Sequence, residues 1–178
     1  KNLIENECEI TVKSYPKINL ESKLIDDAKK KFLIEDNKIN VILGIGGSGP
    51  TKRTPSKTIL KFMDFALKEF DCRFYLATGK KHEEQIILKE ILSKFKDSCL
   101  SLDHMDIKDI LPIIKNCNIS ICNDTSFSHF SAALDIPTIV LMCDTPLEYG
   151  NYSPNMYPII PDNETIVTHG TNGKDKIN

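Results

Sequence analysis

The chain has 178 residues, of which 40% are hydrophobic and 27% are charged, and its formal net charge is -2. This length suits a single domain, and the composition is typical of an ordinary globular protein rather than of a disordered or fibrous one. The small net charge and the lack of a basic stripe argue against nucleic acid as a partner. No apolar run approaches the ~20 residues that would cross a bilayer.

Six cysteines are spread along the chain without a C-x-x-C pair: Cys8, Cys72, Cys99, Cys117, Cys122 and Cys143. Several of them fall within apolar runs that predict strands. We therefore expect reduced, buried thiols rather than zinc ligands or disulfides, and hence a cytoplasmic location. Whether the full-length protein is also peripheral to the inner membrane is left open.

Helices and strands are predicted to alternate along the chain. The N-terminal half predicts a helix over 20–34 capped by Asn19, a strand over 41–45, a helix capped by Thr54 with Pro55 at its first position, a strand over 72–78, a helix over 80–95 and a short strand over 99–102. The C-terminal half predicts a helix capped by Asp106 that Pro112 kinks or shortens, a strand over 119–123, a helix over 126–134 and a final strand over 138–142. This alternation predicts an α/β fold, a Rossmann-like parallel sheet with helices on both faces.

Two loops join a predicted strand to a predicted helix and are candidates for a ligand site: "GIGGSGPTKRTP" (44–55) and "NDTSFSH" (123–129). Ligands of such sheets bind beyond the carboxyl ends of the strands, where the strand order reverses. The first loop matches G-x-G-x-x-G only weakly, because Pro50 follows the third glycine and the helix begins later. It also lacks the Gly-Lys-Ser/Thr order of a P-loop. A loop that binds phosphate through backbone N–H groups and Lys52 is the favoured interpretation, with a plain surface turn as the alternative.

The second loop strengthens the phosphate interpretation. The N–H groups of Thr125 and Ser126 are predicted to lie at the start of a helix, where anions bind. Asp124 cannot bind phosphate itself, so we expect it to cap or orient the loop. His129 is either a structural residue or a donor to phosphate.

These motifs resemble a known family. "NDTSFSHFSAALDIPTIVLM", followed by "TPLEYGNY", resembles the signature of glycosyltransferase family 9, the ADP-heptose:lipopolysaccharide heptosyltransferases. In that family the pattern runs Asp-Thr-Gly-x-x-His-x-x-Ala-Ala-Leu, then a strand, then Asp-Pro and Tyr-Gly. "GGSGPTKRTP" is similar to the family's glycine-rich Lys-Arg-Trp-Pro loop, and the resemblance covers about 38–161.

The resemblance implies that the chain is the C-terminal, donor-binding half of an inverting GT-B enzyme. Residues 1–18 are then the end of an interdomain connection, residues 19–165 the nucleotide-sugar-binding domain and residues 166–178 a truncated polar tail. The donor is an ADP-sugar, by resemblance ADP-heptose, and no cofactor or metal is expected. The catalytic base lies in the N-terminal half, which also binds the acceptor, a lipopolysaccharide core or other glycan. No catalytic residue is therefore expected in this chain.

Several binding residues follow from the resemblance by motif. Lys52 holds the diphosphate together with Gly47 and Ser48 of the same loop. Glu83 accepts the ribose hydroxyls, although it is otherwise an ordinary first-turn acid. Met105 packs against adenine, although it is otherwise an ordinary apolar contact.

The phosphate-binding turn is formed by Asp124, Thr125 and Ser126, with His129 close by. Three departures from the family pattern bear on the donor: Ser126 stands where the family has Gly, Thr54 replaces Trp, and "MCDTP" replaces a Gly-Pro-Thr-Asp-Pro run. Two alternatives therefore remain open. One is a GT-B transferase that uses a UDP- or GDP-sugar for another surface polysaccharide, and the other is a non-catalytic nucleotide-binding module.

Overall fold

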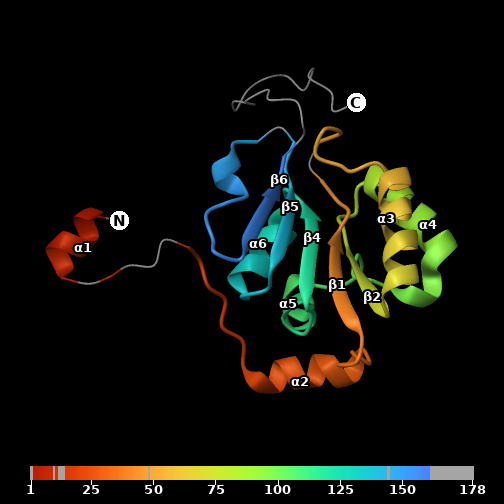
Figure 1. Cartoon of the computed structure of the whole chain (residues 1–178). Coiled ribbons are helices and arrows are strands. Elements are labelled where there is room, and N and C mark those ends of the chain that lie inside the picture. Colours follow the sequence, from red (N-terminus) through yellow and green to blue (C-terminus); the bar gives the residue numbers. More distant parts are fainter. Residues whose placement is uncertain (1, 10, 12–14, 48, 144, 161–178) are drawn as a thin grey trace.

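The centre of the fold is a sheet of six parallel strands in the order β3-β2-β1-β4-β5-β6 (Figure 1). The computed structural model describes residues 2–9, 11, 15–47, 49–143 and 145–160. The strands are β1 (Ile39–Gly44), β2 (Cys72–Ala77), β3 (Cys99–Ser101), β4 (Ile119–Asn123), β5 (Thr138–Leu141) and β6 (Met156–Ile159). The helices are α1 (Asn2–Cys8), α2 (Ser22–Lys31), α3 (Ser56–Glu69), α4 (His82–Phe95), α5 (Ile107–Lys115) and α6 (Ser126–Ala133), with 3-10 turns at Lys96–Ser98 and Leu147–Tyr149.

This strand order is the one found in Rossmann folds, and it confirms the predicted fold class. The chain runs outward from β1 to β3, then returns through α5 to place β4 on the other side of β1. The order therefore reverses between β1 and β4, which pair in register from Val41 and Ile119 to Gly44 and Cys122.

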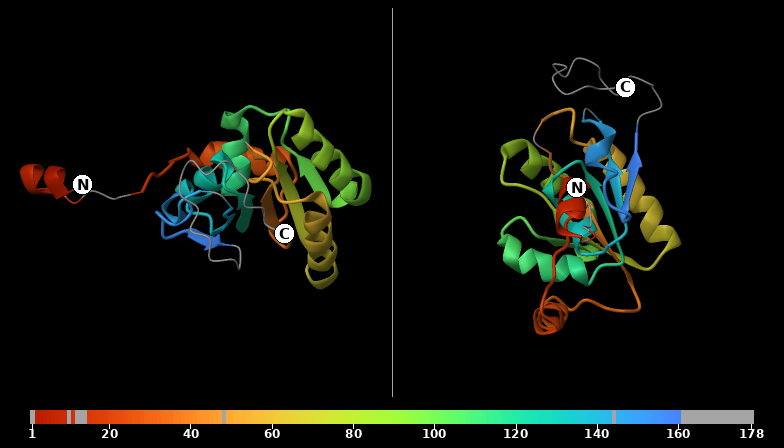
Figure 2. Two further views of the ribbon diagram at one scale, coloured as in Figure 1. Left: turned by 90° about the horizontal axis from the view of Figure 1, so that it is seen from above. Right: turned by 90° about the vertical axis from the view of Figure 1, so that its left-hand side faces the viewer.

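Helices cover both faces of the sheet, as predicted (Figures 1 and 2). Successive residues of a strand point to opposite faces, so Val41 and Leu43 join one apolar cluster while Ile42 joins the other. The first cluster lies beneath α3 and α4, and the second lies beneath α2, α5 and α6. Because both faces are buried, the central strands β1 and β2 are apolar over most of their length, with Asn40 and Arg73 near their starts as the exceptions.

The starts of two helices differ from the prediction. Asn19 does not cap α2, which begins at Ser22 after the N-cap residue Glu21. Thr54 does not cap α3, whose N-cap position is held by Pro55. The Thr54 hydroxyl donates instead to Asn123 at the end of β4, a contact that no local pattern indicates. In α5 the N-cap position of Asp106 is confirmed, and Pro112 lies inside a helix that ends at Lys115.

The prediction that residues 138–142 form the last strand is wrong, because β6 follows β5 and pairs with it in parallel. Its sequence, "MYPI", contains Pro158, and a proline within an apolar run argues against a central strand. β6 lies at the edge of the sheet, where a residue without an N–H group is tolerated. Tyr157 and Ile159 are exposed on this strand.

The N-terminal segment meets the sheet domain at residues 17 and 18. The Ile18 N–H donates to the carbonyl of Ala133, and Lys17 pairs with Asp135 at 3.1 Å. Figures 1 and 2 show α1 apart from the sheet. The assignment of 1–18 to an interdomain connection stays a prediction, and the predicted tail at 166–178 lies outside the described residues.

No disulfide joins any of the cysteines, all of which lie within the described residues. Cys72, Cys117 and Cys122 are buried as expected, whereas Cys8 is exposed. Burial raises the pKa of the Cys122 thiol to about 11, which keeps it protonated. In the part of the chain that the structure describes, every helix is too short or too polar to cross a bilayer.

Candidate functional site

The two loops singled out in the sequence leave the sheet side by side. Gly44 and Cys122 pair at the carboxyl ends of β1 and β4, so the segments that follow them leave the same edge, at the top of Figure 1. This is the point at which the strand order reverses. The position predicted for a ligand site is therefore the position at which the loops meet.

Asn123, the last residue of β4, connects the two loops directly. Its Nδ2 donates to the carbonyl of Gly46 at 2.9 Å, and its Oδ1 accepts the Thr54 hydroxyl at 2.7 Å. The side chain is buried, with 2% of the residue exposed. One amide thus contacts both the first and the last part of the β1–α3 loop.

Lys52 and Asp124 form an ion pair between the loops, with Lys52 Nζ 3.2 Å from Asp124 Oδ2. The Thr145 hydroxyl donates to the same carboxylate oxygen at 2.7 Å. The Asp124 side chain is 7% exposed and that of Lys52 is 22% exposed, so the pair is largely shielded from water. The Asp124 carboxylate thus contacts both Lys52 and Thr145, and its predicted role in orienting the loop stays a prediction.

His129 lies on α6 beside this pair. Its Nδ1 is 2.8 Å from the Tyr152 hydroxyl, and the two rings are stacked with their centroids 5.6 Å apart. Its Nε2 is 3.8 Å from Asp124 Oδ1, beyond hydrogen-bond distance. Burial lowers the pKa of His129, the Asp124 carboxylate opposes this shift and the Lys52 cation adds to it. The His129 imidazole is thus held by Tyr152 and is less readily protonated than an imidazole in water.

Close approach explains two of the glycines in and near the first loop. A Cβ on Gly46 would lie 2.7 Å from Glu84 Oε1, and one on Gly79 would lie 2.5 Å from Glu84 Oε2. The carboxylate of Glu84 thus fits between Gly46 and Gly79, where a side chain on either residue would collide with it. It accepts the Gly47 N–H at 2.8 Å and the Lys81 N–H at 3.4 Å.

This arrangement modifies the role expected for Gly47. Its N–H was predicted to be available to phosphate, but the structure directs that N–H to Glu84. Glu84 is 6% exposed and is a residue whose importance sequence reasoning missed. In the sequence it looks like any other acid in the first turn of a helix. Its buried role becomes visible only in the structure, where Gly46 and Gly79 lie against its carboxylate.

Glu83 has a different environment from its neighbour. Its side chain is 62% exposed, and its Oε2 lies 3.7 Å from an Arg53 nitrogen. The pKa of Glu83 is lowered, chiefly by the backbone N–H at the start of α4 and further by Arg53. Met105 follows β3 and packs against the apolar cluster beneath α5. It is therefore two strands away from the Lys52 loop.

Thr125 and Ser126 begin α6 as predicted, with Thr125 in the N-cap position. Within the described residues the Thr125 hydroxyl is buried without a hydrogen-bond partner, while its carbonyl accepts from Ser128. Ser126 is exposed, and it is not among the residues with a positive φ. A serine in place of the family's glycine therefore causes no backbone strain here. Ser48, the remaining predicted residue, lies outside the described residues.

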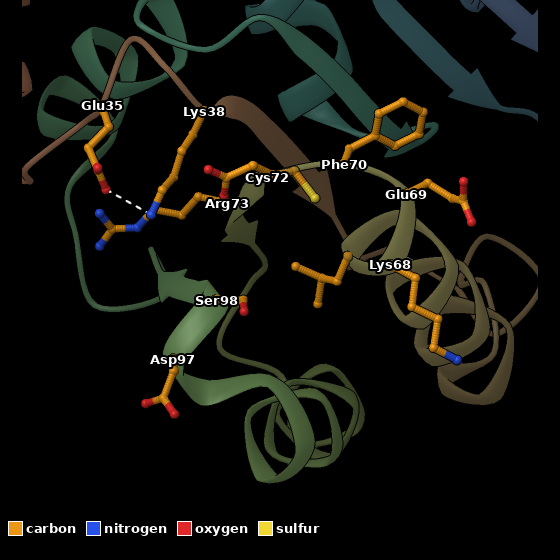
Figure 3. Close-up of a pocket in the computed structure, with 11 residues that line it drawn as sticks. Glu35, Lys38, Lys68, Glu69, Phe70, Cys72, Arg73, Asp97 and Ser98 are labelled. Carbon is orange, nitrogen blue, oxygen red and sulfur yellow. Dashed lines mark ion pairs between the residues drawn. The ribbon is translucent and has the colours of Figure 1, made fainter.

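A cavity of about 600 Å3 lies at the opposite edge of the sheet, where β2 and β3 begin (Figure 3). Both signs of charge line it, and Lys38 pairs with Glu35 at 3.0 Å while Arg73 donates to the carbonyl of Leu33. Ligands of parallel sheets bind at the carboxyl edge. This cavity is therefore not the candidate donor site.

Among the described residues, no cluster of three or more His, Cys, Asp or Glu side chains is arranged to hold a metal ion. The charged groups at the loop junction include Lys52, Asp124 and the carboxylate of Glu84, and Arg53 lies in the same loop 3.7 Å from Glu83. Among the described residues, the positive groups there include the Lys52 ammonium, the Arg53 guanidinium and the start of α6.

Comparison with known proteins relates the chain to one family. The family model of glycosyltransferase family 9 (heptosyltransferase) matches residues 3–177. The chain is 23% identical over 155 residues to lipopolysaccharide heptosyltransferase 1 of Campylobacter coli, a match that covers 83% of this chain and 44% of that protein. The chain thus spans less than half the length of this curated relative.

Solved structures show the same fold. The ADP-heptose LPS heptosyltransferase II of E. coli superposes with a TM-score of 0.69 at 18% identity, over 81% of this chain and 45% of that one. The E. coli heptosyltransferase WaaC with ADP superposes with a TM-score of 0.63 at 21% identity, over 70% of this chain and 38% of that one. The Rossmann-like sheet, the junction of the two loops and the family match over 3–177 lead to one conclusion: this chain belongs to glycosyltransferase family 9, the heptosyltransferase family.

Proposed function

We propose that this chain is the donor-binding half of an inverting glycosyltransferase of GT-B architecture. Its donor is an ADP-sugar, ADP-heptose by family, and its product belongs to the lipopolysaccharide core. The observation that carries the proposal is the meeting of Lys52 and the start of α6 at the point where the strand order reverses. A solved relative contains ADP and another contains ADP-2-deoxy-2-fluoro heptose, and both share this fold.

The diphosphate is assigned to Lys52 and the first turn of α6. A phosphate oxygen that accepts from the Lys52 ammonium forms a charge-assisted bond worth ~1.5–3 kcal/mol, and a helix N-terminus adds ~0.3–1 kcal/mol. Thr125 and Ser126 supply that N-terminus, and the unpartnered Thr125 hydroxyl is a further group that could serve an oxygen ligand. Asp124 keeps Lys52 in place before the donor arrives.

The nucleoside is assigned to the β1–β3 side of the sheet edge. Glu83 is exposed at the start of α4, where its ionised carboxylate can accept two ribose hydroxyls. Met105 follows β3 and supplies a polarisable apolar surface for adenine. No metal is invoked, because Lys52 and the α6 dipole offset the phosphate charge.

The two halves of the enzyme divide the reaction. Transfer requires the acceptor hydroxyl to lose its proton as it attacks the anomeric carbon, with the base held in near-attack geometry. His129 and Asp124 lie with the phosphate residues, so they are better placed to act on the leaving diphosphate than on an acceptor. We assign the base and the acceptor surface to the part of the relatives that this chain does not cover.

The test is a comparison of binding with turnover. We expect this chain to bind ADP weakly and to transfer no sugar from ADP-heptose to a truncated lipopolysaccharide acceptor, because the cleft lacks its second wall. A version extended to the length of the relatives should transfer. Transfer by the 178-residue chain at a similar rate would show that the base lies within it. A calorimetric panel of ADP, UDP and GDP tests the base of the nucleotide, and tighter binding of UDP or GDP would contradict the assignment to ADP.

A further inference from the structure

The β1–α3 loop has its two ends joined through one side chain. Asn123 Nδ2 donates to the carbonyl of Gly46 at one end, at 2.9 Å, and Asn123 Oδ1 accepts from Thr54 at the other, at 2.7 Å. Gly46 and Thr54 are therefore separated by a single amide group. Between them in sequence lies Lys52, whose position depends on where these two ends are fixed.

The side-chain amide of Asn123 acts as both a donor and an acceptor here, so no carboxylate or apolar side chain could make the same two contacts. The Gly46 carbonyl can only accept a hydrogen bond, and the Thr54 hydroxyl donates its proton. A carboxylate in place of the amide could accept from Thr54 but could not donate to Gly46. An apolar side chain could do neither and would leave the buried Gly46 carbonyl and the half-buried Thr54 hydroxyl without this partner.

We call the Gly46–Asn123–Thr54 contacts the loop clasp. The position of Asn123 in the chain places this clasp next to Asp124 and its partner Lys52. Asn123 directly precedes Asp124, which holds the Lys52 ammonium at 3.2 Å. The clasp therefore fixes the backbone on both sides of Lys52 to the strand that carries its ion-pair partner.

Thr54, which closes the clasp, is one of the three departures from the family pattern noted in the sequence. Thr54 stands where the family pattern has Trp, so the hydroxyl that closes the clasp comes with that substitution. The short Thr54 side chain reaches Asn123 at 2.7 Å across 69 residues of sequence. A position that departs from the family pattern thus has a defined partner rather than an idle surface role.

We propose that Asn123 and Thr54 are positioning residues for the donor diphosphate. They hold the β1–α3 loop so that the Lys52 ammonium faces the start of α6, and they do not touch the donor themselves. This inference rests on the proposed function of the junction as a diphosphate site. It predicts that breaking the clasp affects ligands with a diphosphate and leaves those without one unaffected.

The test compares two substitutions at one position that differ in whether the hydroxyl is kept. Thr54→Val removes the hydroxyl and keeps the shape, while Thr54→Ser keeps the hydroxyl and serves as the matched control. NMR titrations of the chain with ADP and with adenosine give both affinities. We expect Thr54→Val to weaken ADP about tenfold, the equivalent of one hydrogen bond. Adenosine should change by less than about twofold, and Thr54→Ser should bind both ligands as the unaltered chain does.

A second measurement needs no ligand. The Gly47 N–H, which donates to Glu84 at 2.8 Å, directly follows the clasped Gly46. Its hydrogen exchange should be faster in Thr54→Val and unchanged in Thr54→Ser, at equal thermal stability of the two variants. If contacts other than the Thr54–Asn123 hydrogen bond hold the loop, the Gly47 N–H should exchange at the same rate in Thr54→Val and Thr54→Ser.

The outcomes separate this inference from the function on which it rests. An unaltered chain that binds no nucleoside diphosphate would overturn the proposed donor site and the clasp's purpose together. An unaltered chain that binds ADP, with Thr54→Val binding it equally well, would overturn the clasp alone. Equal losses of ADP and adenosine in Thr54→Val would also overturn it, because they would show a general effect on the fold.

Discussion

Lys52 and Asp124 are 72 residues apart in the sequence, and their Nζ and Oδ2 atoms lie 3.2 Å apart across the junction of the β1 and β4 loops. The ammonium therefore has a carboxylate partner when no donor is bound. A diphosphate that reaches Lys52 must compete with Asp124 or share the ammonium with it. Part of the attraction between Lys52 and phosphate is offset by this exchange.

Lys52→Ala should weaken the binding of ADP by about 1.5–3 kcal/mol, toward the lower end because of the exchange with Asp124. The loss should be much smaller for adenosine, which has no diphosphate. Isothermal calorimetry with both ligands measures the difference. Lys61→Ala, a change at an exposed lysine of α3, is the control and should alter neither affinity. Equal losses for the two ligands would mean that Lys52 acts on the base or on the fold.

Substitutions of Glu83 and Glu84, neighbouring acids of α4, should differ in their effect on the free energy of unfolding. Glu84→Ala leaves the buried Gly47 N–H without its acceptor and should lower the free energy of unfolding by about 1.5–3 kcal/mol. Glu83→Ala removes an exposed side chain and should leave that free energy nearly unchanged.

The same pair separates structure from binding. Glu83→Ala should weaken ADP and adenosine alike, since both carry the ribose. Chemical denaturation gives the free energy of unfolding of both variants, and titrations with ADP and adenosine give the two affinities of Glu83→Ala. A stable Glu84→Ala variant, or a Glu83→Ala variant with full affinity for both ligands, would contradict the respective assignment.

Stability should fall as the solution is acidified through the range of histidine titration. The pKa of His129 is lowered in the folded chain, chiefly by burial, so the unfolded state binds the proton more readily. The contribution of His129 is then complete above the unfolded value of about 6.5 and decreases as the pH falls below it toward the lower folded value. Denaturant midpoints between pH 8 and pH 5 measure this slope.

His129→Gln is the matched variant for this experiment, because it keeps a polar group beside Tyr152 and has no proton to gain. The difference in slope between the two chains isolates His129 from the carboxylates that also titrate in acid. Identical slopes would show that the pKa of His129 is the same in the folded and unfolded states.

Gly44→Ala should destabilise the domain by about 1–3 kcal/mol through overpacking. A Cβ on Gly44 would lie 2.5 Å from the Cys122 sulfur and 2.8 Å from its Cβ, at the paired ends of β1 and β4. Gly49→Ala is the control, because its nearest neighbour would be the Thr51 hydroxyl at 3.8 Å. Thermal unfolding of both variants checks the contrast, and a Gly49→Ala variant as unstable as Gly44→Ala would refute this steric argument.

The sequence predicted most of the fold because the buried parallel strands are mostly apolar and stand out between amphipathic helices. Five strands and the meeting of two distant loops followed from that pattern. β6 was missed because Pro158 is unfavourable in the centre of a sheet and tolerated at its edge, and a single sequence does not show which strand is the edge.

The site was predicted less completely, for a different reason. Lys52 and Asp124 could be placed at one edge because both follow strands. Local spacing could not show that Thr54 bonds to Asn123 rather than capping α3. Nor could it show that Glu84 is buried while Glu83 is exposed, since this depends on Gly46 and Gly79, which come from two other loops.

The central position of β1 also affects how the chain folds. β1 pairs on one side with β2, and on the other with β4, where Asn40 and Asn118 exchange hydrogen bonds over 78 residues of sequence. Pairings between residues so far apart form slowly, because the loop between them must close before the contact contributes. During synthesis, β1 to β3 can associate while β4 is still within the ribosome, with one side of β1 uncovered. We expect the slow step of folding to be the arrival of β4, and with it the assembly of the junction of the two loops.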